Sequence, residues 1–490
     1  MRYLYQQLMK LHQSCGKSRL KRKAVWVTGS LLLALLFSIF GCRKFIEVPL
    51  PNTESFPDVI FSNDINATGA IIGIYGKMIT NNAWASGNTR SVTLLSGLSA
   101  DELENYSALT IPREFYENSI NINNTAIETA FWDEAYQYIY AANAALEGLS
   151  NPNGVSDGTK MQLEGEALFI RAFCHFYLVN LFGDIPYLTN TDYKTNIVMA
   201  RTLKDRVYQL IVADLKEAQG KLKETYTAAG GITGRVRPNK FTATAFLARV
   251  YLYMANWKEA EIQANAVIEY TTYYGLDSLN GVFLKDSKET IWQLMPNANT
   301  GYNTWEGKNF ILTLLPTTDE SNSVVLGPYL LQAFEPGDLR RIKWVDSIKS
   351  DAGGVYYFPY KYKIQNGNEL KEYSMVFRLA EQYLIRAEAR ARLGQIDGAK
   401  EDLDIIRQRA GLLGTRANTT TELLIAIAHE RQVELFTEWG HRWLDLKRTN
   451  RANTILSAEK ASTWQATDTL YPIPQKERAL NKNLTQNIGY

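Results

Sequence analysis

Residues 160–182, KMQLEGEALFIRAFCHFYLVNLF, followed by Gly183-Asp184-Ile185-Pro186, decide the fold of this chain. A helix over this stretch would be apolar around most of its circumference, and such a helix is buried among other helices. The glycine and the proline end it directly. The sequence therefore predicts a mainly α fold built around this helix. One face of the helix carries Leu163, Ala167, Ile170, Phe173, Cys174, Tyr177 and Leu181, with Cys174 as a core thiol, while Phe169, Phe176 and Leu178 lie off that face.

Further amphipathic stretches surround this helix. We expect a helix at 127–149 that pairs with 160–182, and a first helix over about 65–80. Scaffold helices should continue through 127–270 and return over 374–448. These ranges predict a helical scaffold that is interrupted twice.

Two of the helical stretches, 241–270 and 380–409, repeat each other. In the first, Ala248 and Ala260 are twelve residues apart, and in the second Ala387 and Ala399 have the same spacing. These are the small-residue positions at which the two helices of a tetratricopeptide repeat pack closely. The sequence therefore predicts a tetratricopeptide-like helical scaffold.

Two stretches between the helices look different. Residues 81–125 and 271–373 are rich in Gly, Asn and Thr with scattered aromatic residues, and Val355–Phe358 is a short β-like run. Long irregular excursions in compact domains are often functional. We expect them to form an irregular, loop-rich inserted face that binds a ligand.

Aromatic residues inside these polar loops are the candidate ligand-binding residues. A sugar presents an apolar C–H face that stacks on aromatic rings, and hydroxyl groups that need amide and carboxylate partners. The alternative is that the rings pin the loops onto the scaffold, since aromatic residues contribute large buried areas. The candidates are Trp84, Asn105 and Tyr106 in the first excursion and Trp292, Tyr302 and Trp305 in the second.

The N-terminus has the order of a secretory signal. Residues 1–23 carry seven basic residues and no acidic one, residues 24–41 are uncharged and mostly apolar, and Cys42 follows. Ile39-Phe40-Gly41-Cys42 resembles a bacterial lipobox, in which the cysteine is acylated and becomes the new N-terminus, although Phe40 is bulkier than the usual residue there. We expect a signal peptide at 1–41, lipidation of Cys42 and one mature domain at 42–490. The alternative is a retained anchor, because the apolar stretch could just span a bilayer.

The charge of the mature chain excludes one class of partner. The whole chain has 53 basic and 51 acidic residues, and the predicted signal peptide removes seven basic residues and no acidic one. The mature chain would then hold 46 basic and 51 acidic residues, a formal charge of −5. A mildly acidic protein of this kind argues against binding to nucleic acid, because that affinity depends on neutralising phosphates.

No constellation of catalytic residues stands out. The histidines of the mature chain are not at metal-ligand spacing, and the motifs of serine hydrolases, zinc proteases and phosphate-binding loops are absent. Glu430, Glu434 and Glu438 are spaced to share one helix face, where they could bind a metal or act as acid and base. The interpretation we favour is salt bridging to Arg431, Arg442 and Arg448. We therefore expect no catalytic residue, no metal and no cofactor.

Four segments together resemble one known family, the SusD/RagB nutrient-binding lipoproteins. The resemblance spans the whole mature chain. The segments are Arg171-Ala172-Phe173 with His175 to Tyr187; Phe377-Arg378-Leu379-Ala380-Glu381 with Tyr383-Leu384 and Ala387-Glu388-Ala389; Glu430-Arg431 and Glu434-Leu435 with Gly440 to Arg448; and Tyr471-Pro472-Ile473-Pro474 with Asn483 to Tyr490.

This resemblance implies a function. Members of the family are anchored by lipid in the outer membrane, capture oligosaccharides or in some cases peptides, and act as a lid over a TonB-dependent SusC-like channel. We therefore expect a non-enzymatic protein of the outer membrane, facing outward. Surface-exposed relatives often carry acidic residues after the lipidated cysteine, whereas Arg43 and Lys44 follow Cys42 here. The family's ligand residues vary with the ligand, so none is carried over.

Two other functions stay open at this point. The same capture role could serve peptides, or the chain could be an extracytoplasmic hydrolase on a helical scaffold. The missing catalytic constellation favours capture over hydrolysis.

Overall fold

Helix α7, Asp157–Phe182, is the central helix of the protein, and every residue from Gly165 to Phe182 is buried. The computed structural model describes residues 57–80, 84–152, 154–228, 231, 234–297 and 301–490. The predicted signal peptide and the predicted lipid site, Cys42, lie outside the described residues. The helix ends at Gly183, whose φ of 75° caps it in a conformation that favours glycine.

The other scaffold helices follow one another around α7. A π-helical stretch, Ala126–Asp133, leads directly into α6. The helices are α2 (Pro57–Ile60), α3 (Asp64–Thr80), α6 (Glu134–Ser150), α9 (Lys204–Lys221), α10 (Lys240–Tyr253), α11 (Trp257–Ile268), α15 (Leu379–Arg392), α16 (Ile396–Arg409) and α17 (Thr420–Glu434), with a short α8 (Tyr193–Asn196) before α9.

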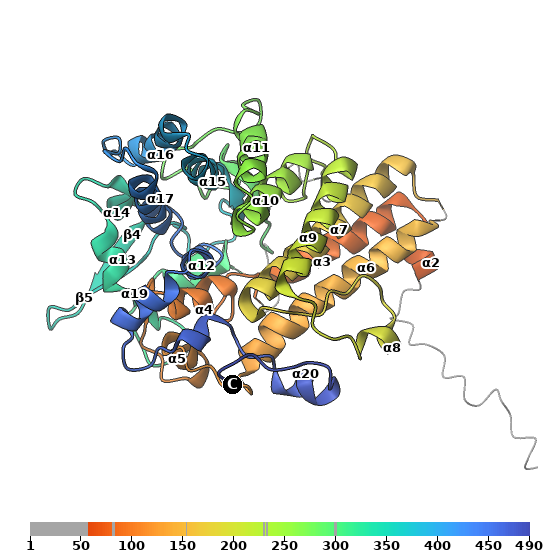
Figure 1. The fold of residues 1–490 in the computed structure, drawn as a ribbon, viewed down its shortest axis with the longest axis horizontal. Coiled ribbons are helices and arrows are strands. Elements are labelled where there is room, and N and C mark those ends of the chain that lie inside the picture. The colour runs from red at the N-terminus through yellow and green to blue at the C-terminus, as the bar shows by residue number, and fades with distance from the viewer. Residues whose placement is uncertain (1–56, 81–83, 153, 229–230, 232–233, 298–300) are drawn as a thin grey trace, which may run out of the picture. The chain divides into compact units, whose positions relative to one another are not determined.

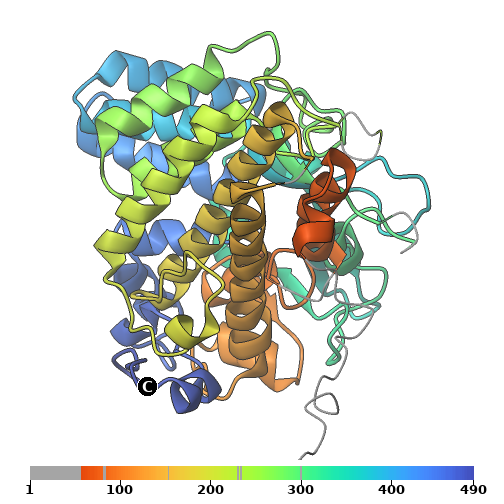
Figure 2. The same ribbon diagram turned by 90° about the vertical axis from the view of Figure 1, so that its right-hand side faces the viewer.

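These helices pack as a continuous series. Helix α7 packs on α6 and α9, α9 on α10, α10 on α11, α11 on α15, and α15 on both α16 and α17. The series can be followed in Figure 1 from the orange and yellow helices through the green pair to the blue ones. Figure 2 shows α6 and α7 running alongside each other with α3 next to them.

The two repeated helix pairs have the predicted geometry. Ala248 of α10 and Ala260 of α11 are fully buried, and so are Ala387 of α15 and Ala399 of α16. Small side chains at these positions let the paired helices approach closely. The prediction of a mainly α, tetratricopeptide-like scaffold is confirmed.

The two excursions contain more regular structure than their composition suggests. The first, expected to be irregular, holds α4 (Val92–Ser99), β1 (Leu103–Asn105) and α5 (Thr110–Tyr116). The second holds β2 (Thr290–Leu294), α12 (Trp305–Phe310), β3 (Val324–Leu326), α13 (Pro328–Ala333), α14 (Leu339–Lys343), β4 (Val345–Lys349) and β5 (Val355–Pro359), and is followed by β6 (Ser374–Arg378). The β-like run Val355–Phe358 is therefore a strand.

Short antiparallel strand pairs join the excursions to each other and to the scaffold. Strand β1 pairs with β3, so the first excursion is bound to the second. Strand β2 pairs with β6, which runs directly into α15. Strands β4 and β5 form a hairpin. The loop-rich face is therefore tied together by backbone hydrogen bonds between segments far apart in sequence.

The C-terminal segment returns to α7. It contains α18 (His441–Arg448), α19 (Ala452–Glu459), a 3-10 turn (Ala466–Thr469) and α20 (Gln475–Leu480). The amide of Tyr471 donates to the carbonyl of Leu181 at 2.8 Å, close to the C-terminal end of α7. In Figure 1 the marked C-terminus lies beside α20.

The core is aromatic and centred on α7. Phe169 and Phe173 lie edge-on to Trp292 at ring-centroid distances of 5.1 and 5.3 Å, and both contact Phe246 and Phe377. Cys174 is fully buried, as predicted for a core thiol, and burial raises the pKa of that thiol. Within the described ranges no helix is both long and apolar enough to cross a bilayer.

Candidate functional site

Two of the six sequence-predicted ligand residues belong to the core. The exposed fraction of Trp84 is 1% and that of Trp292 is 0%. Trp84 lies against Phe173 and Tyr177 of α7, and Trp439 lies edge-on to it at a ring-centroid distance of 6.3 Å. Both indole rings are covered by protein, so the prediction that they stack on a ligand is corrected here. They are the rings that pin the loops onto the scaffold.

Asn105 and Tyr106 lie at the end of β1. The side-chain amide of Asn105 donates to the carbonyl of Ser107 and its Oδ1 accepts the Ser107 amide, both at 3.0 Å, so this residue shapes the turn after the strand. Tyr106 is 39% exposed and lies edge-on to Tyr356 of β5 at 5.7 Å. The two tyrosines form an accessible aromatic pair at the junction of the two excursions.

Tyr302 and Trp305 form a second aromatic pair. Their ring centroids are 4.6 Å apart, and both side chains are half-buried. The Nε1 of Trp305 donates to the carbonyl of Ile79 at 2.9 Å, which ties the ring to the C-terminal turn of α3. A ring fixed in this way loses little conformational freedom when a ligand stacks on it.

The residues around Trp305 hold α12 in place. Thr304 caps the helix by accepting the Gly307 amide at 3.0 Å. Glu306, the residue after Trp305, is buried and accepts a hydrogen bond from Ser374 of β6 at 2.5 Å. Burial raises the pKa of Glu306 to about 7. A Cβ on Gly87 would lie 2.3 Å from the carboxyl carbon of Glu306, so this glycine makes room for the buried side chain.

The two aromatic pairs are held by different elements. Tyr106 follows β1 and Tyr356 lies on β5, whereas Tyr302 and Trp305 lie at the start of α12 next to α3. Tyr356 was missed from sequence because it lies in the β-like run, which predicts a strand and not a binding residue. A cavity of about 430 Å³ adjoins the first excursion, between Arg90, Glu320 and the start of α5.

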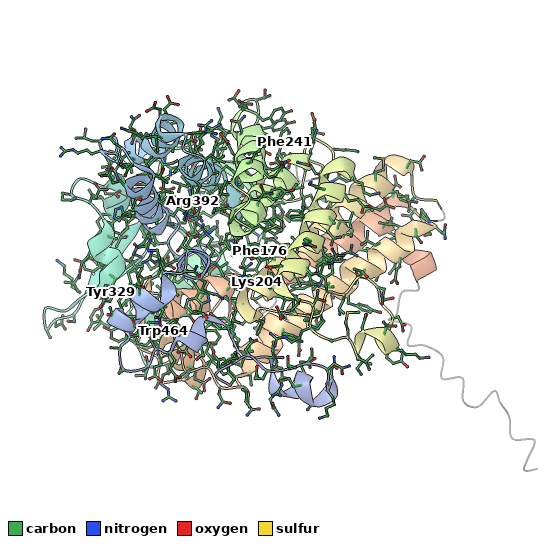
Figure 3. All side chains as sticks on the ribbon, viewed as in Figure 1. Phe176, Lys204, Phe241, Tyr329, Arg392 and Trp464 are labelled. Carbon is green, nitrogen blue, oxygen red and sulfur yellow. The ribbon has the colours of Figure 1, made fainter. Side chains whose placement is uncertain are left out.

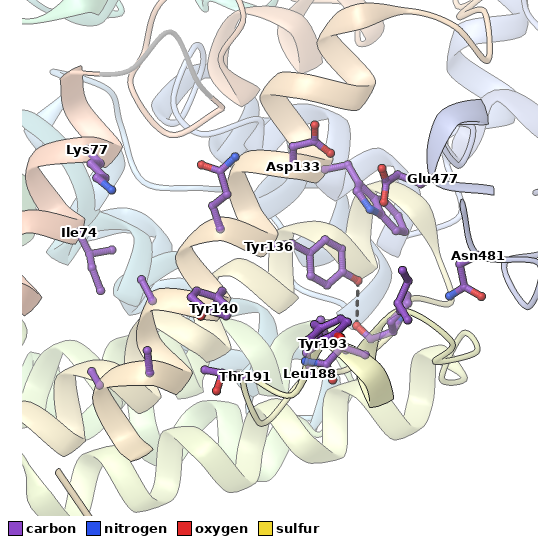
Figure 4. Close-up of a pocket in the computed structure, with 18 of the residues that line it drawn as sticks. Ile74, Lys77, Asp133, Tyr136, Tyr140, Leu188, Thr191, Tyr193, Glu477 and Asn481 are labelled. Carbon is purple, nitrogen blue, oxygen red and sulfur yellow. Dashed lines mark hydrogen bonds between the residues drawn. The ribbon is translucent and has the colours of Figure 1, made fainter. Parts of the chain in front are cut away.

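The scaffold has a separate pocket of about 820 Å³, drawn in Figure 4. It lies between α3, α6, the loop after α7 and α20. Tyr140 and Tyr193 are 57% and 70% exposed at this pocket, and the hydroxyl of Tyr136 donates to the carbonyl of Pro186 at 2.8 Å. This pocket could not be predicted from the sequence, because its aromatic residues have the pattern of the apolar face of a scaffold helix.

One side of this pocket is acidic. Asp133 and Glu477 lie near each other in Figure 4, while Lys77 lies apart from them. Partial burial raises the pKa of both carboxyl groups, and the charge of Asp133 raises the pKa of Glu477 further. The pocket therefore combines an apolar floor with two carboxylates that repel each other.

Glu335, His429 and Glu430 place possible metal-ligand atoms within 4.8 Å of one another. The guanidinium of Arg407 lies against two of them, donating to Glu335 at 2.6 Å and to Glu430 at 3.4 Å. Arg340 donates to Glu430 at 2.6 Å. Because cations of the chain already neutralise these carboxylates, the group is explained by ion pairing.

Glu430, Glu434 and Glu438 form salt bridges, as favoured from the sequence, but with other partners. Glu438 lies beyond the end of α17, so the three do not share one helix face. Although burial alone would raise it, the charges of the surrounding arginines hold the pKa of Glu434 well below its usual range. The observed partners are Arg340, Arg378, Arg407, Arg409 and Lys361.

The three arginines expected as partners pair elsewhere. Arg431 binds Asp445 at 2.7 Å, and Arg442 binds Asp101 of the first excursion. Arg448 binds both Asp445 and Glu388 at 2.7 Å. The predicted partners were therefore wrong, and the actual ones come from chain segments that sequence spacing could not identify.

Two family models match this chain. One, described as starch-binding associating with outer membrane, matches residues 77–252, and the other, the SusD family, matches residues 343–490. Together they cover both halves of the helical scaffold.

Whole-chain relatives agree with these matches. SusD-like protein P2 of Formosa agariphila is 27% identical over 94% of this chain and 98% of its own length. The crystal structure of a SusD superfamily protein from Bacteroides vulgatus superposes with a TM-score of 0.76 at 20% identity, over 87% of this chain and 99% of that one. A laminarin-binding SusD-like protein superposes with a TM-score of 0.72 at 24% identity, over 88% and 100% of the two chains.

Proposed function

This chain belongs to the SusD/RagB family of glycan-binding proteins, and from that premise we propose that it captures nutrient oligosaccharides at the outer membrane without changing them. It then hands them to a TonB-dependent SusC-like channel. The lipid on Cys42 anchors it, with the ligand-binding face directed outward.

The observation that carries the capture role is the Tyr302–Trp305 pair. Two rings 4.6 Å apart present apolar surface at the edge of a polar loop region. The bond from Trp305 to Ile79 and the buried Glu306 next to it hold the pair in position before any ligand arrives. A sugar ring stacking on such a prearranged surface binds without an ordering cost in the protein.

Tyr106 and Tyr356 are the second contact that we assign to a longer glycan. Tyr106 is exposed, and its amide donates to the carbonyl of Ser323 at 2.7 Å, which fixes its backbone. Asn105 supports this turn, so its role in binding is indirect.

The first experiment is a binding screen. Purified protein is titrated with laminarin, which a structural relative binds, and tested on arrays of other glycans and of peptides. Binding of a glycan supports the proposal. Binding of peptides alone would replace the glycan with a peptide in the same capture role.

The same samples test the absence of chemistry. The ligand recovered after long incubation should be unchanged in length and mass. A product that increases with protein concentration and survives repurification would instead indicate a hydrolase, and Asp133 and Glu477 of the scaffold pocket would be the first residues to substitute.

A further inference from the structure

The C-terminal end of α7 is covered by the C-terminal segment, and cations satisfy its last carbonyl groups. Lys447 of α18 donates to the carbonyl of Asn180. Arg201 donates to the carbonyl of Phe182 at 3.2 Å and to that of Asp184 at 2.6 Å. The last carbonyls of a helix lack partners within the helix and carry partial negative charge, so cations stabilise this end.

Capping alone does not require these charges. The side-chain amide of Asn487 also donates to the Phe182 carbonyl, at 2.9 Å, so a neutral group caps the same carbonyl. All further hydrogen bonds of Arg201 go to neutral groups, Thr485 and Asn487. In the described part of the chain, no carboxylate oxygen lies within 4 Å of Arg201 or Lys447.

A third cation faces the same space. Lys204, labelled in Figure 3, is the first residue of α9 and also has no ion-pair partner among the described residues. By contrast, Arg448 lines the same space and is neutralised by Asp445 and Glu388. The carboxylate of Asp184 also lines this space and accepts the backbone amide of Lys204 at 2.7 Å. Against this one negative charge stand Arg201, Lys204 and Lys447, so positive charge is in excess among the lining residues.

Between these cations lies a cavity of about 870 Å³. Its size suits a small organic ligand, since such sites span roughly 300–1,000 Å³. Neutral hydrogen-bonding side chains also line it, among them Asn450, Asn453, Thr467 and Thr469. The hydroxyl of Tyr253, which also lines the cavity, is buried and has no partner in the part of the chain that the structure describes.

The positive charges of Lys204 and Lys447 repel each other across the cavity. Burial, with the like charge of Lys204, lowers the pKa of Lys447 well below its usual value. An anion between the two ammonium groups would remove this repulsion and accept hydrogen bonds from the remaining N–H groups of Lys447. Such charge-assisted hydrogen bonds are stronger than bonds between neutral groups.

We propose that the cavity between Lys204, Lys447 and Arg201 is a binding site for a small oxyanion, namely a carboxylate, sulfate or phosphate group. The anion could be free or be carried by an acidic sugar. This site is separate from the aromatic pair on the loop-rich face, and the proposal does not depend on the capture of neutral glycans there.

The test is calorimetric titration of the purified protein with inorganic phosphate, inorganic sulfate and glucuronate, with glucose as the uncharged control. We expect saturable binding of at least one anion, weakening with added sodium chloride, and no binding of glucose. Glucuronate binding more tightly than the inorganic anions would identify an acidic sugar as the ligand, and the reverse order would identify a free anion.

Three variants assign the site. Lys204→Gln should weaken anion binding roughly two- to fivefold, as for an exposed ion pair, and Lys447→Gln at least about tenfold. Lys258→Gln, at an exposed lysine of α11, should bind like wild type. Lys204 is on the surface, so its variant tests the site even if Lys447→Gln fails to fold. The proposal would be overturned if no anion binds, or if wild type and Lys204→Gln bind the anion equally. Either result would leave the proposed capture of laminarin at the aromatic pair untouched.

Discussion

Ala255 and Gly394 occupy the same position in the two repeated helix pairs, and both have a positive φ, 55° and 78°. Each follows the first helix of its pair. The next residue closes the turn in both cases, with Asn256 donating to the Tyr251 carbonyl and Gln395 to the Arg390 carbonyl, each at 2.9 Å. The second pair has glycine at this left-handed position, where glycine is unstrained. The first pair has Ala255 there, and its Cβ makes the same conformation strained.

Ala255→Gly should therefore stabilise the protein. The left-handed conformation costs a residue with a Cβ about 1–2 kcal/mol, and the added flexibility of glycine in the unfolded chain offsets about 0.4–1 kcal/mol of the gain. We expect an increase of up to about 1.6 kcal/mol in the free energy of unfolding, measured by urea denaturation. Gly394→Ala is the matched control and should destabilise. A loss of stability in Ala255→Gly would contradict the strain at Ala255.

Arg378→Met should destabilise the protein strongly. Arg378 is 2% exposed and binds Glu289, Glu434 and Glu438, so its loss leaves buried carboxylates without a partner. Breaking such a group costs about 3–5 kcal/mol. Lys240→Met, which breaks an exposed pair with Glu224, should cost less than about 1 kcal/mol. Equal effects of the two variants in denaturant melts would show that the buried cluster contributes no more than a surface pair.

Glu306 should make stability fall as the pH rises. Burial raises the pKa of its carboxyl group from 4.5 to about 7, so the folded protein holds a proton that the unfolded chain has already lost. Its contribution is fully present below pH 4.5 and is lost as the pH rises through 7, a decrease of about 3 kcal/mol. The difference in unfolding free energy between wild type and Glu306→Gln should show this decrease between pH 4 and 8.

The matched control for this titration is Glu401→Gln, at an exposed glutamate of α16. Its pH dependence should follow that of wild type. If Glu306→Gln also follows wild type across this range, the carboxyl group of Glu306 ionises in the folded protein as it does in water.

Trp305→Ala should weaken glycan binding. Ring stacking contributes about 0.5–1.5 kcal/mol beyond area burial, which corresponds to roughly 2- to 13-fold in affinity. Tyr140→Ala, at the exposed tyrosine of the scaffold pocket, is the control and should bind like wild type. If Tyr140→Ala loses the ligand while Trp305→Ala keeps it, the glycan occupies the scaffold pocket.

Trp84→Ala should instead lower the melting temperature of the protein, because the Trp84 ring is in the core.

Cys42→Ala should abolish lipid attachment. The lipobox-like Ile39–Cys42 predicts that this thiol is the one acylated. Cells grown with a labelled fatty acid should incorporate it into wild type and into Cys174→Ala, whose thiol is in the core, but not into Cys42→Ala. The last variant should also leave the membrane fraction or keep its signal peptide. Equal labelling of all three proteins would exclude Cys42 as the lipid site.

The scaffold was predictable because its signals are local. The apolar circumference of 160–182 predicts a buried helix, and α7 covers Asp157–Phe182. The alanine spacing of the two repeats predicts close helix pairs, and all four alanines are buried. Helix periodicity and small-residue spacing depend only on neighbours along the chain.

The loop-rich face was less predictable, because polar composition does not tell which side chains turn inward. Trp84 and Trp292 sit in Gly- and Asn-rich surroundings, yet both rings pack on α7. The partners of Glu430 and Glu434 come from elements far away in sequence, such as Arg340 of α14 and Arg378 of β6. Contacts of this range are set by the tertiary fold, and no spacing along the chain encodes them.

The covering of α7 by the C-terminal segment has a consequence for biosynthesis. The bond from Asn487 to the Phe182 carbonyl joins residues 305 positions apart. A ribosome must therefore release almost the whole chain before the end of its central helix can be covered. A growing chain therefore stays incompletely packed at this helix end until translation is almost finished. A premature stop before Tyr471 would leave α7 uncovered and the product open to proteases.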